Sequence, residues 1–217
     1  MSRSFFLGSL FFILMFLPSE AVFSGETQAQ RDFFVLEDFS NQSTNGLPSG
    51  WKPQRNNPAP DEVYQLDAND GESLLRANGK PNRIFKKMKW NPHEYPFITW
   101  KWRMLKVPDD PDKERNATVY VALGTDLLGI PKLTKYAWSS LKAVGTEESG
   151  GMFRPTTIVI RSGQPENGEW ITETINVLED HKRLHNEMPP DEAYGFGIIS
   201  TLEAEFGPFI VHKGISE

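Results

Sequence analysis

Apolar side chains alternate with mostly polar ones along residues 97–104 of the chain. The apolar set comprises Ile98, Trp100, Trp102 and Met104. Side chains two residues apart lie on the same face of a β-strand, so the pattern predicts a half-buried strand with its two indoles side by side. An all-apolar face usually points inward, which predicts that the indoles belong to a core between two sheets. The alternative is a stacking platform for sugar rings.

Short β-rich runs separated by clusters of Pro, Gly and Asn continue along the chain from residue 33 onward. Regularly spaced strands without helical periods between them predict an all-β fold, either an antiparallel sandwich or a barrel. Strands are expected at Phe33–Phe39, Val63–Leu66, Ser73–Ala77, Asn82–Met88, Phe97–Leu105, Ala117–Leu123, Thr134–Ser140, Thr156–Ser162, Trp170–Leu178, Ala193–Ser200 and Phe206–Val211.

Turn and helix signals complete this pattern. Asn69-Asp70-Gly71 separates two apolar runs and supplies residue types that tolerate positive φ, which predicts a hairpin. The proline-rich segment Thr44–Asp61 is expected to be an extended covering loop rather than a strand. One short helix is predicted over Leu178–Asn186, closed by Met188-Pro189-Pro190.

The first residues have the pattern of a secretory signal peptide. Arg3 supplies a positive charge, residues 5–17 form an apolar run too short to span a bilayer comfortably, and Pro18 and small residues follow. We therefore expect a signal peptide over residues 1–24, a single domain over residues 30–217, and a periplasmic or secreted protein with no membrane span after cleavage. An uncleaved anchor is the alternative, although no stop-transfer flank follows.

Composition narrows the classes of function. The chain contains no cysteine, which removes thiolate nucleophiles and cysteine zinc sites, and a mature domain of this size can be stable without disulfides. The formal net charge is −6, from 23 Lys and Arg against 29 Asp and Glu. An acidic chain without a basic run is a poor candidate for binding nucleic acid, and we expect a monomer.

Cationic and aromatic residues on the polar phase of three predicted central strands are the candidates for ligand binding. Arg103, Tyr120 and Arg161 fall opposite the apolar positions of their strands, and Trp138 shares a face with Tyr136. If the strands were neighbours, these residues would form a patch suited to a sugar hydroxyl, a uronate or another anionic glycan. The alternative is a set of surface salt bridges with Asp180 or glutamates.

Metal and catalytic signals are weak. His181 and His185 are four residues apart on the predicted helix, as two zinc ligands would be, but the glutamate between them that marks zinc hydrolases is missing. Asp180 is expected to cap that helix or to pair with an arginine. No serine has the setting of a nucleophile elbow, and acidic pairs are uninformative among so many carboxylates. We expect no metal and no cofactor.

Several motifs occur in a fixed order along the chain. They are Leu47–Trp51, Leu74–Ala77, Tyr95–Arg103, Val119–Val121, Tyr136–Ser139, Ile158–Gly163, Glu173, Val177, Asp180, Arg183 and Pro189-Pro190. Together they resemble an uncharacterised group of exported bacterial proteins that is catalogued only as a domain of unknown function, family 3047. The resemblance extends from about Phe39 to Val211 and implies a periplasmic or secreted β-sandwich of the jelly-roll kind shared by many carbohydrate-binding modules. Members tend to carry a Thr-Asp-rich loop where this chain has the short turn Ser200–Phe206 without Asp.

Together these patterns predict an exported, non-catalytic protein that binds a glycan or another envelope component. Arg103, Tyr120, Trp138 and Arg161 are its predicted binding residues. The alternative is a hydrolase of envelope polysaccharide or ester, which would show a deep cleft with two facing acids or a serine beside a histidine. A third possibility, a structural partner in an envelope complex, would show a contiguous exposed apolar patch.

Overall fold

The computed structural model of the chain describes residues 32–41, 46–69, 71–150, 155–165 and 168–214. The predicted signal peptide lies outside the described residues, so it remains a prediction. Within the described ranges, no helix has both the length and the apolar character needed to cross a bilayer.

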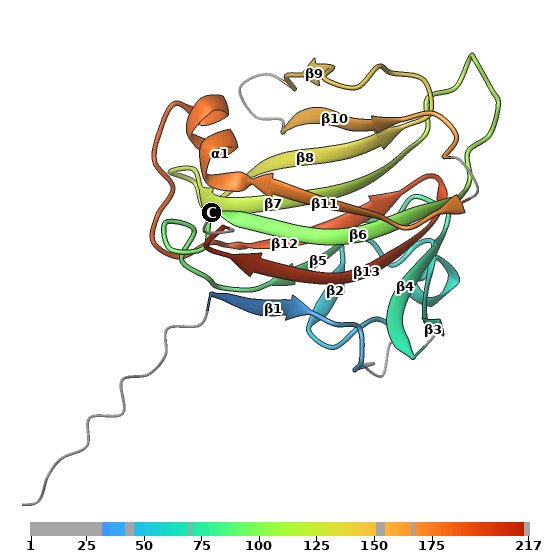
Figure 1. The fold of residues 1–217 in the computed structure, drawn as a ribbon, viewed down its shortest axis with the longest axis horizontal. Helices are drawn as coiled ribbons and strands as arrows, with labels where there is room; N and C mark the ends of the chain where they lie inside the picture. The colour runs from blue at the N-terminus through green and yellow to red at the C-terminus, as the bar shows by residue number, and fades with distance from the viewer. Residues whose placement is uncertain (1–31, 42–45, 70, 151–154, 166–167, 215–217) are drawn as a thin grey trace, which may run out of the picture. The chain divides into compact units, whose positions relative to one another are not determined.

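The described chain forms two β-sheets packed face to face, with one α-helix at one end (Figure 1). The six-stranded sheet has the order β11-β6-β13-β4-β3, with β1 pairing β13, and the seven-stranded sheet has the order β2-β5-β12-β7-β8-β10-β9. This architecture is the jelly-roll-like β-sandwich that the sequence predicted. The strands are β1 (Phe33–Glu37), β2 (Trp51–Pro53), β3 (Tyr64–Asn69), β4 (Glu72–Asn78), β5 (Ile84–Lys87), β6 (Phe97–Lys106), β7 (Asn116–Thr125), β8 (Pro131–Ser139), β9 (Glu147–Glu148), β10 (Thr156–Ser162), β11 (Ile171–Asn176), β12 (Gly195–Ser200) and β13 (Glu203–His212).

Each of the eleven predicted strands corresponds to a strand of the structure, and β3 and β4 form the predicted hairpin, with Asn69 opposite Glu72. Two strands were not predicted. β2 lies in the segment expected to be only a covering loop, and β9 is a strand of two residues. A 3₁₀-helix (Pro60–Glu62) also lies in that segment.

One strand pair departs from the predicted antiparallel arrangement. β8 and β10 run parallel, with Thr156 opposite Thr134 and Ser162 opposite Ser139. The chain between them is long enough to return to the starting end of β8, which a parallel pair requires. β9 in this connection then pairs antiparallel with the outer side of β10.

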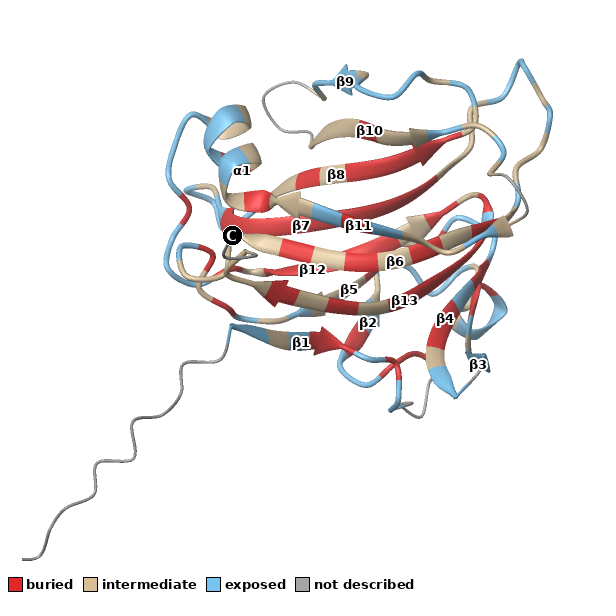
Figure 2. Ribbon diagram, in the orientation of Figure 1, coloured by how far each residue is buried: buried red, intermediate tan, exposed pale blue. Residues whose placement is uncertain are grey.

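The core between the sheets contains the two indoles of β6, as the alternation predicted. Trp100 is 1% exposed and Trp102 is fully buried, and buried and part-exposed residues alternate along β6 (Figure 2). Trp102 meets Trp138 of the other sheet edge to face, with ring centroids 5.7 Å apart. The interpretation of these indoles as core is therefore confirmed, and the sugar-stacking alternative at this face is wrong.

The helix α1 (Val177–His185) begins one residue before the predicted range. Asn176 rather than Asp180 caps it, because the Asn176 side chain accepts a hydrogen bond from the Glu179 N–H at 3.1 Å. Asp180 instead accepts from the Tyr136 hydroxyl at 3.0 Å and pairs with Arg183 at 2.9 Å, so the predicted pairing with an arginine is confirmed.

Candidate functional site

Arg103 lies on the outer face of the six-stranded sheet, the face that the alternation of β6 predicted. Its Nε is paired, because Glu205 stands directly opposite on β13 and its Oε2 is 2.5 Å from the Arg103 Nε. The guanidinium carbon also lies 4.8 Å from the centre of the Trp170 ring. The salt-bridge alternative is therefore confirmed at this position.

Arg161 does not lie on the outward face of its strand, and a β-bulge is the reason. Val159 is in register with Ala137, but Arg161 is in register with Trp138, so Ile160 is an extra residue on β10. The bulge reverses the alternation and puts Arg161 on the same side of the sheet as Trp138, which faces the core. The sequence could not reveal this change of phase.

Arg161 instead links the two sheets through Glu173 of β11. Its Nε is 2.7 Å from Glu173 Oε1 and its Nη2 is 3.2 Å from Oε2, and the buried Trp102 Nε1 donates to Oε1 at 3.0 Å. The hydrogen bond to Glu173 is the main reason that the Arg161 pKa is raised above its ordinary value. Arg161 therefore has a structural partner, as the salt-bridge alternative predicted.

The four predicted binding residues do not form one patch. β6, which carries Arg103, belongs to one sheet, whereas β7, β8 and β10 belong to the other, so Arg103 and Arg161 are not on adjacent strands. Trp138 is buried in the core, where its Nε1 donates to the Gly163 carbonyl at 2.8 Å. Of these four described residues, Tyr120 alone lines the cleft described next.

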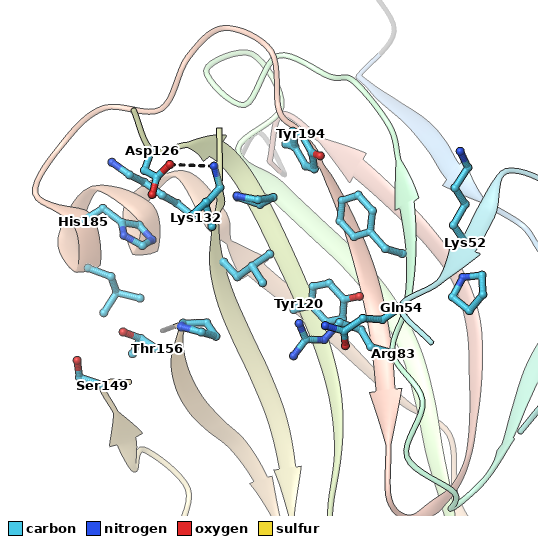
Figure 3. Close-up of a pocket in the computed structure, with 17 residues that line it drawn as sticks. Lys52, Gln54, Arg83, Tyr120, Asp126, Lys132, Ser149, Thr156, His185 and Tyr194 are labelled. Atoms are coloured by element: carbon cyan, nitrogen blue, oxygen red, sulfur yellow. Dashed lines mark hydrogen bonds between the residues drawn. The ribbon is translucent and has the colours of Figure 1, made fainter. Parts of the chain in front are cut away.

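This cleft has a volume of about 800 Å³ and lies over the outer face of the seven-stranded sheet (Figure 3). Its lining comes from β2, β5, β7, β8, the start of β10, the end of α1 and the segments joining them. The lining residues are Lys52, Pro53, Gln54, Arg83, Phe85, Tyr120, Asp126, Ile130, Pro131, Lys132, Leu133, Ser149, Pro155, Thr156, Leu184, His185 and Tyr194.

Tyr120 forms part of the cleft floor, and Gly197 of β12 makes room for it. A Cβ on Gly197 would lie 2.4 Å from the Tyr120 ring and hydroxyl and 2.4 Å from the Ile84 carbonyl oxygen. The hydroxyl donates to that carbonyl at 2.7 Å, and burial raises the Tyr120 pKa, so the group stays a protonated donor. Tyr120 is only 1% exposed, which makes it a support for its neighbours rather than a contact surface.

Two part-exposed aromatic rings continue this surface. Phe85 stacks on Tyr120 with centroids 6.0 Å apart and planes inclined by 10°, and Tyr194 lies 5.6 Å from Phe85. The Lys87 ammonium lies 4.9 Å from the Tyr194 ring centre. The cleft therefore offers flat apolar faces next to hydrogen-bond donors.

Cations outnumber acids in the cleft. Arg83 places its guanidinium carbon 5.1 Å from the Tyr120 ring centre, and Lys135 stands beside Tyr120 on β8. Burial first, and repulsion by Arg83 second, lower the Lys135 pKa. Among the described residues that line the cleft, Asp126 is the single carboxylate, and its Oδ1 accepts from the backbone N–H groups of Leu128 and Ile130 at 2.8 Å. The Asp126 carboxylate therefore stabilises the turn that follows it.

The two histidines of α1 lie beside the cleft, with ring centroids 4.5 Å apart. Burial lowers the His181 pKa to about 4, and burial also lowers the His185 pKa, so both rings are neutral at pH 7. Glu187 is 3.6 Å from His181 but is paired with Lys132 at 2.5 Å. Within the described ranges, no three His, Asp or Glu side chains gather as a metal site would require.

Sequence reasoning missed most of the cleft, including Arg83, Phe85 and Tyr194, and it missed Lys135 beside Tyr120. A usable signal was present on the predicted strand Asn82–Met88, where Arg83, Phe85 and Lys87 share one face by the two-residue period. Neither the pairing of that strand with β12 nor the space left by Gly197 could be read from the sequence.

A family model described as "Protein of unknown function (DUF3047)" matches residues 49–201. No curated protein matches the chain. Among solved structures, a family 11 carbohydrate-binding module from Clostridium thermocellum, in complex with a β-1,3-1,4-mixed-linked tetrasaccharide, is 9% identical with a TM-score of 0.44, covering 85% of this chain and 98% of that one. A family 11 xylanase from Neocallimastix patriciarum is 13% identical with a TM-score of 0.35, covering 81% and 96%. With TM-scores below 0.5, these likenesses identify neither a ligand nor an activity.

Proposed function

The chain belongs to the DUF3047 family of proteins of unknown function, and we propose that this member is an exported, non-catalytic protein that binds a polysaccharide in its cleft. The observation that carries the proposal is the lining of the cleft, where the part-exposed rings of Phe85 and Tyr194 lie next to Arg83. The apolar faces of sugar rings pack on aromatic side chains. The sugar hydroxyls accept hydrogen bonds from cationic donors.

The size and setting of the cleft support this proposal. A volume of about 800 Å³ lies within the range of small-molecule sites and is sufficient for a short stretch of sugar chain. The cleft opens on a sheet whose strands fix the side chains in register, so the rings and cations are held in place before a ligand arrives. Such preorganisation reduces the entropy lost on binding.

The lining does not favour the hydrolase alternative. Hydrolysis of a glycosidic bond uses two carboxyl groups on either side of the bond. Asp126 is the single carboxylate among the described lining residues, and two backbone N–H groups already occupy one of its oxygens.

The proposed location is the periplasm or the extracellular space, with the protein as a monomer. Support for export comes from the positive charge, apolar run and small residues at the N-terminus. A cysteine-free chain is stable in such a compartment through its core of packed aromatic residues.

Titration calorimetry after a glycan-array screen tests the proposal, using the chain from residue 30 onward. Tyr194→Ala and Phe85→Ala should weaken binding by about tenfold or more, the loss expected when an aromatic anchor is removed. Trp170→Ala is the matched control, because this part-exposed ring lies near Arg103 on the other sheet. No polysaccharide binding up to millimolar concentration, or an equal loss with the control, would refute the proposal.

A further inference from the structure

We propose that the polysaccharide is acidic and that Arg83 of the cleft lining, with Lys135 next to it on β8, binds the carboxylate of a uronic acid residue. This inference rests on the proposed function and specifies the class of ligand.

Arg83 is held in place at the cleft. Its backbone carbonyl accepts from the Gln54 N–H at 2.7 Å, and its guanidinium lies over the Tyr120 ring. The Arg83 Nε is buried and has no hydrogen-bond partner among the described residues. Because Arg83 lines the cleft, its guanidinium is placed to donate to an anionic group there.

Lys135 adds a second positive charge at the same place. It is directly opposite Tyr120 in the β7–β8 register, and it is close enough to Arg83 for repulsion to contribute to its lowered pKa. Among the described residues, neither Arg83 nor Lys135 has a carboxylate within salt-bridge distance. Two neighbouring, part-buried cations without a counter-ion favour an anion between them.

Arg83 differs from two other arginines of the sandwich. Arg103 pairs with the buried Glu205 and Arg161 with the buried Glu173. Although the chain has 29 acids against 23 cations, no ion pair to Arg83 is present among the described residues.

A uronate matches these groups in shape as well as charge. The planar guanidinium donates two parallel N–H bonds to a planar carboxylate, and the Lys135 ammonium can bind an oxygen from the other side. The Tyr120 hydroxyl does not compete, because it already donates to Ile84. The sugar ring that bears the carboxylate would then lie toward Phe85, which stacks on Tyr120.

The test compares an acidic oligomer with its uncharged methyl ester and adds a second acidic polymer. Oligogalacturonate, its fully methyl-esterified form and alginate oligomers are titrated into the protein at low salt by calorimetry. We expect at least one of the two acidic oligomers to bind, with affinity falling from about 50 mM to 500 mM salt. If oligogalacturonate is that ligand, its ester should bind about tenfold or more weakly.

Variants then assign the binding to this pair of cations. Arg83→Gln and Lys135→Gln should each weaken binding of the acidic oligomer by about tenfold or more, and Arg83→Lys should also weaken it. Arg76→Gln is the control, since Arg76 is exposed on β4 of the other sheet. Thermal melts show whether each variant is folded. If Arg83→Gln fails to fold, Lys135→Gln alone tests the assignment.

The outcomes separate this inference from the proposed function. If neutral oligosaccharides bind as well as acidic ones and depend on Tyr194 but not on Arg83 or Lys135, the uronate assignment is wrong and the polysaccharide cleft stands. Binding of a sulfated dextran but of neither acidic oligomer would likewise overturn the carboxylate assignment. If no charged or neutral polysaccharide binds, both proposals fall.

Discussion

Glu173 joins the two sheets, so removing its carboxylate gives a sharp test of the packing described above. The side chain accepts from Arg161 of β10 and from the indole Nε1 of Trp102 on β6. Glu173→Ala would remove both acceptors at once. Glu173→Gln would keep an oxygen for the indole and remove only the charge, so the two variants separate the contributions.

The environment of each partner sets the magnitude. Trp102 is fully buried, and an indole N–H left there without an acceptor costs about 1–3 kcal/mol. The Arg161 side chain is 41% exposed, so water replaces much of its lost partner and its share is about 0–1 kcal/mol. We therefore expect Glu173→Ala to lower the free energy of unfolding by about 1–4 kcal/mol, and Glu173→Gln by about 1 kcal/mol.

Urea unfolding followed by far-ultraviolet circular dichroism measures both variants without depending on tryptophan emission. A double-mutant cycle with Arg161→Gln isolates the ion pair and should give a coupling below about 1 kcal/mol. Arg161→Lys should lose the second hydrogen bond with a small change in stability. A Glu173→Ala protein within about 0.5 kcal/mol of wild type would refute the inter-sheet role of this carboxylate.

Three further predictions follow from burial and close contact. Trp102→Ala should cost about 3–5 kcal/mol in urea unfolding, and an unchanged midpoint would contradict its place in the core. Gly197→Ala should displace Tyr120, lower stability by about 1–3 kcal/mol and weaken ligand binding in calorimetry; a protein unchanged in both would contradict the close contact. Burial lowers the His181 pKa to about 4, so the unfolded chain takes up the proton first. The free energy of unfolding should then have its full value above about pH 6.5 and fall by up to about 3 kcal/mol as the pH drops toward 4. His181→Phe should reduce this pH dependence. Urea unfolding at several pH values measures it, and the same pH dependence in the wild type and the variant would contradict the prediction.

The sequence predicted the strands and most of their faces because a strand has a period of two, and that period is local. The indoles of β6 and the hairpin before Gly71 followed from this rule and from turn chemistry. The predictions that failed depend on how distant strands pair. The single extra residue at Ile160 reversed the face of Arg161, and its effect is visible only in the register with β8.

The candidate site was predictable only in part for the same reason. Alternation identifies which residues share a face but not which strands become neighbours, so Arg103 was grouped with residues of the other sheet. Tyr120 was chosen for the correct face, yet its burial depends on Phe85 and Gly197, which come from two distant segments. The unpaired state of Arg83 likewise depends on the absence of acids from the neighbouring strands.

The position of β13 has a consequence for how the chain matures. β13 is the last strand of the described chain in sequence, yet it lies inside the six-stranded sheet and pairs with β6, β4 and β1. Until it is synthesised, the pairs β11–β6 and β3–β4 have nothing to join them in that sheet. The six-stranded sheet therefore cannot close until β13 has been synthesised, and loop closure over most of the chain slows this step.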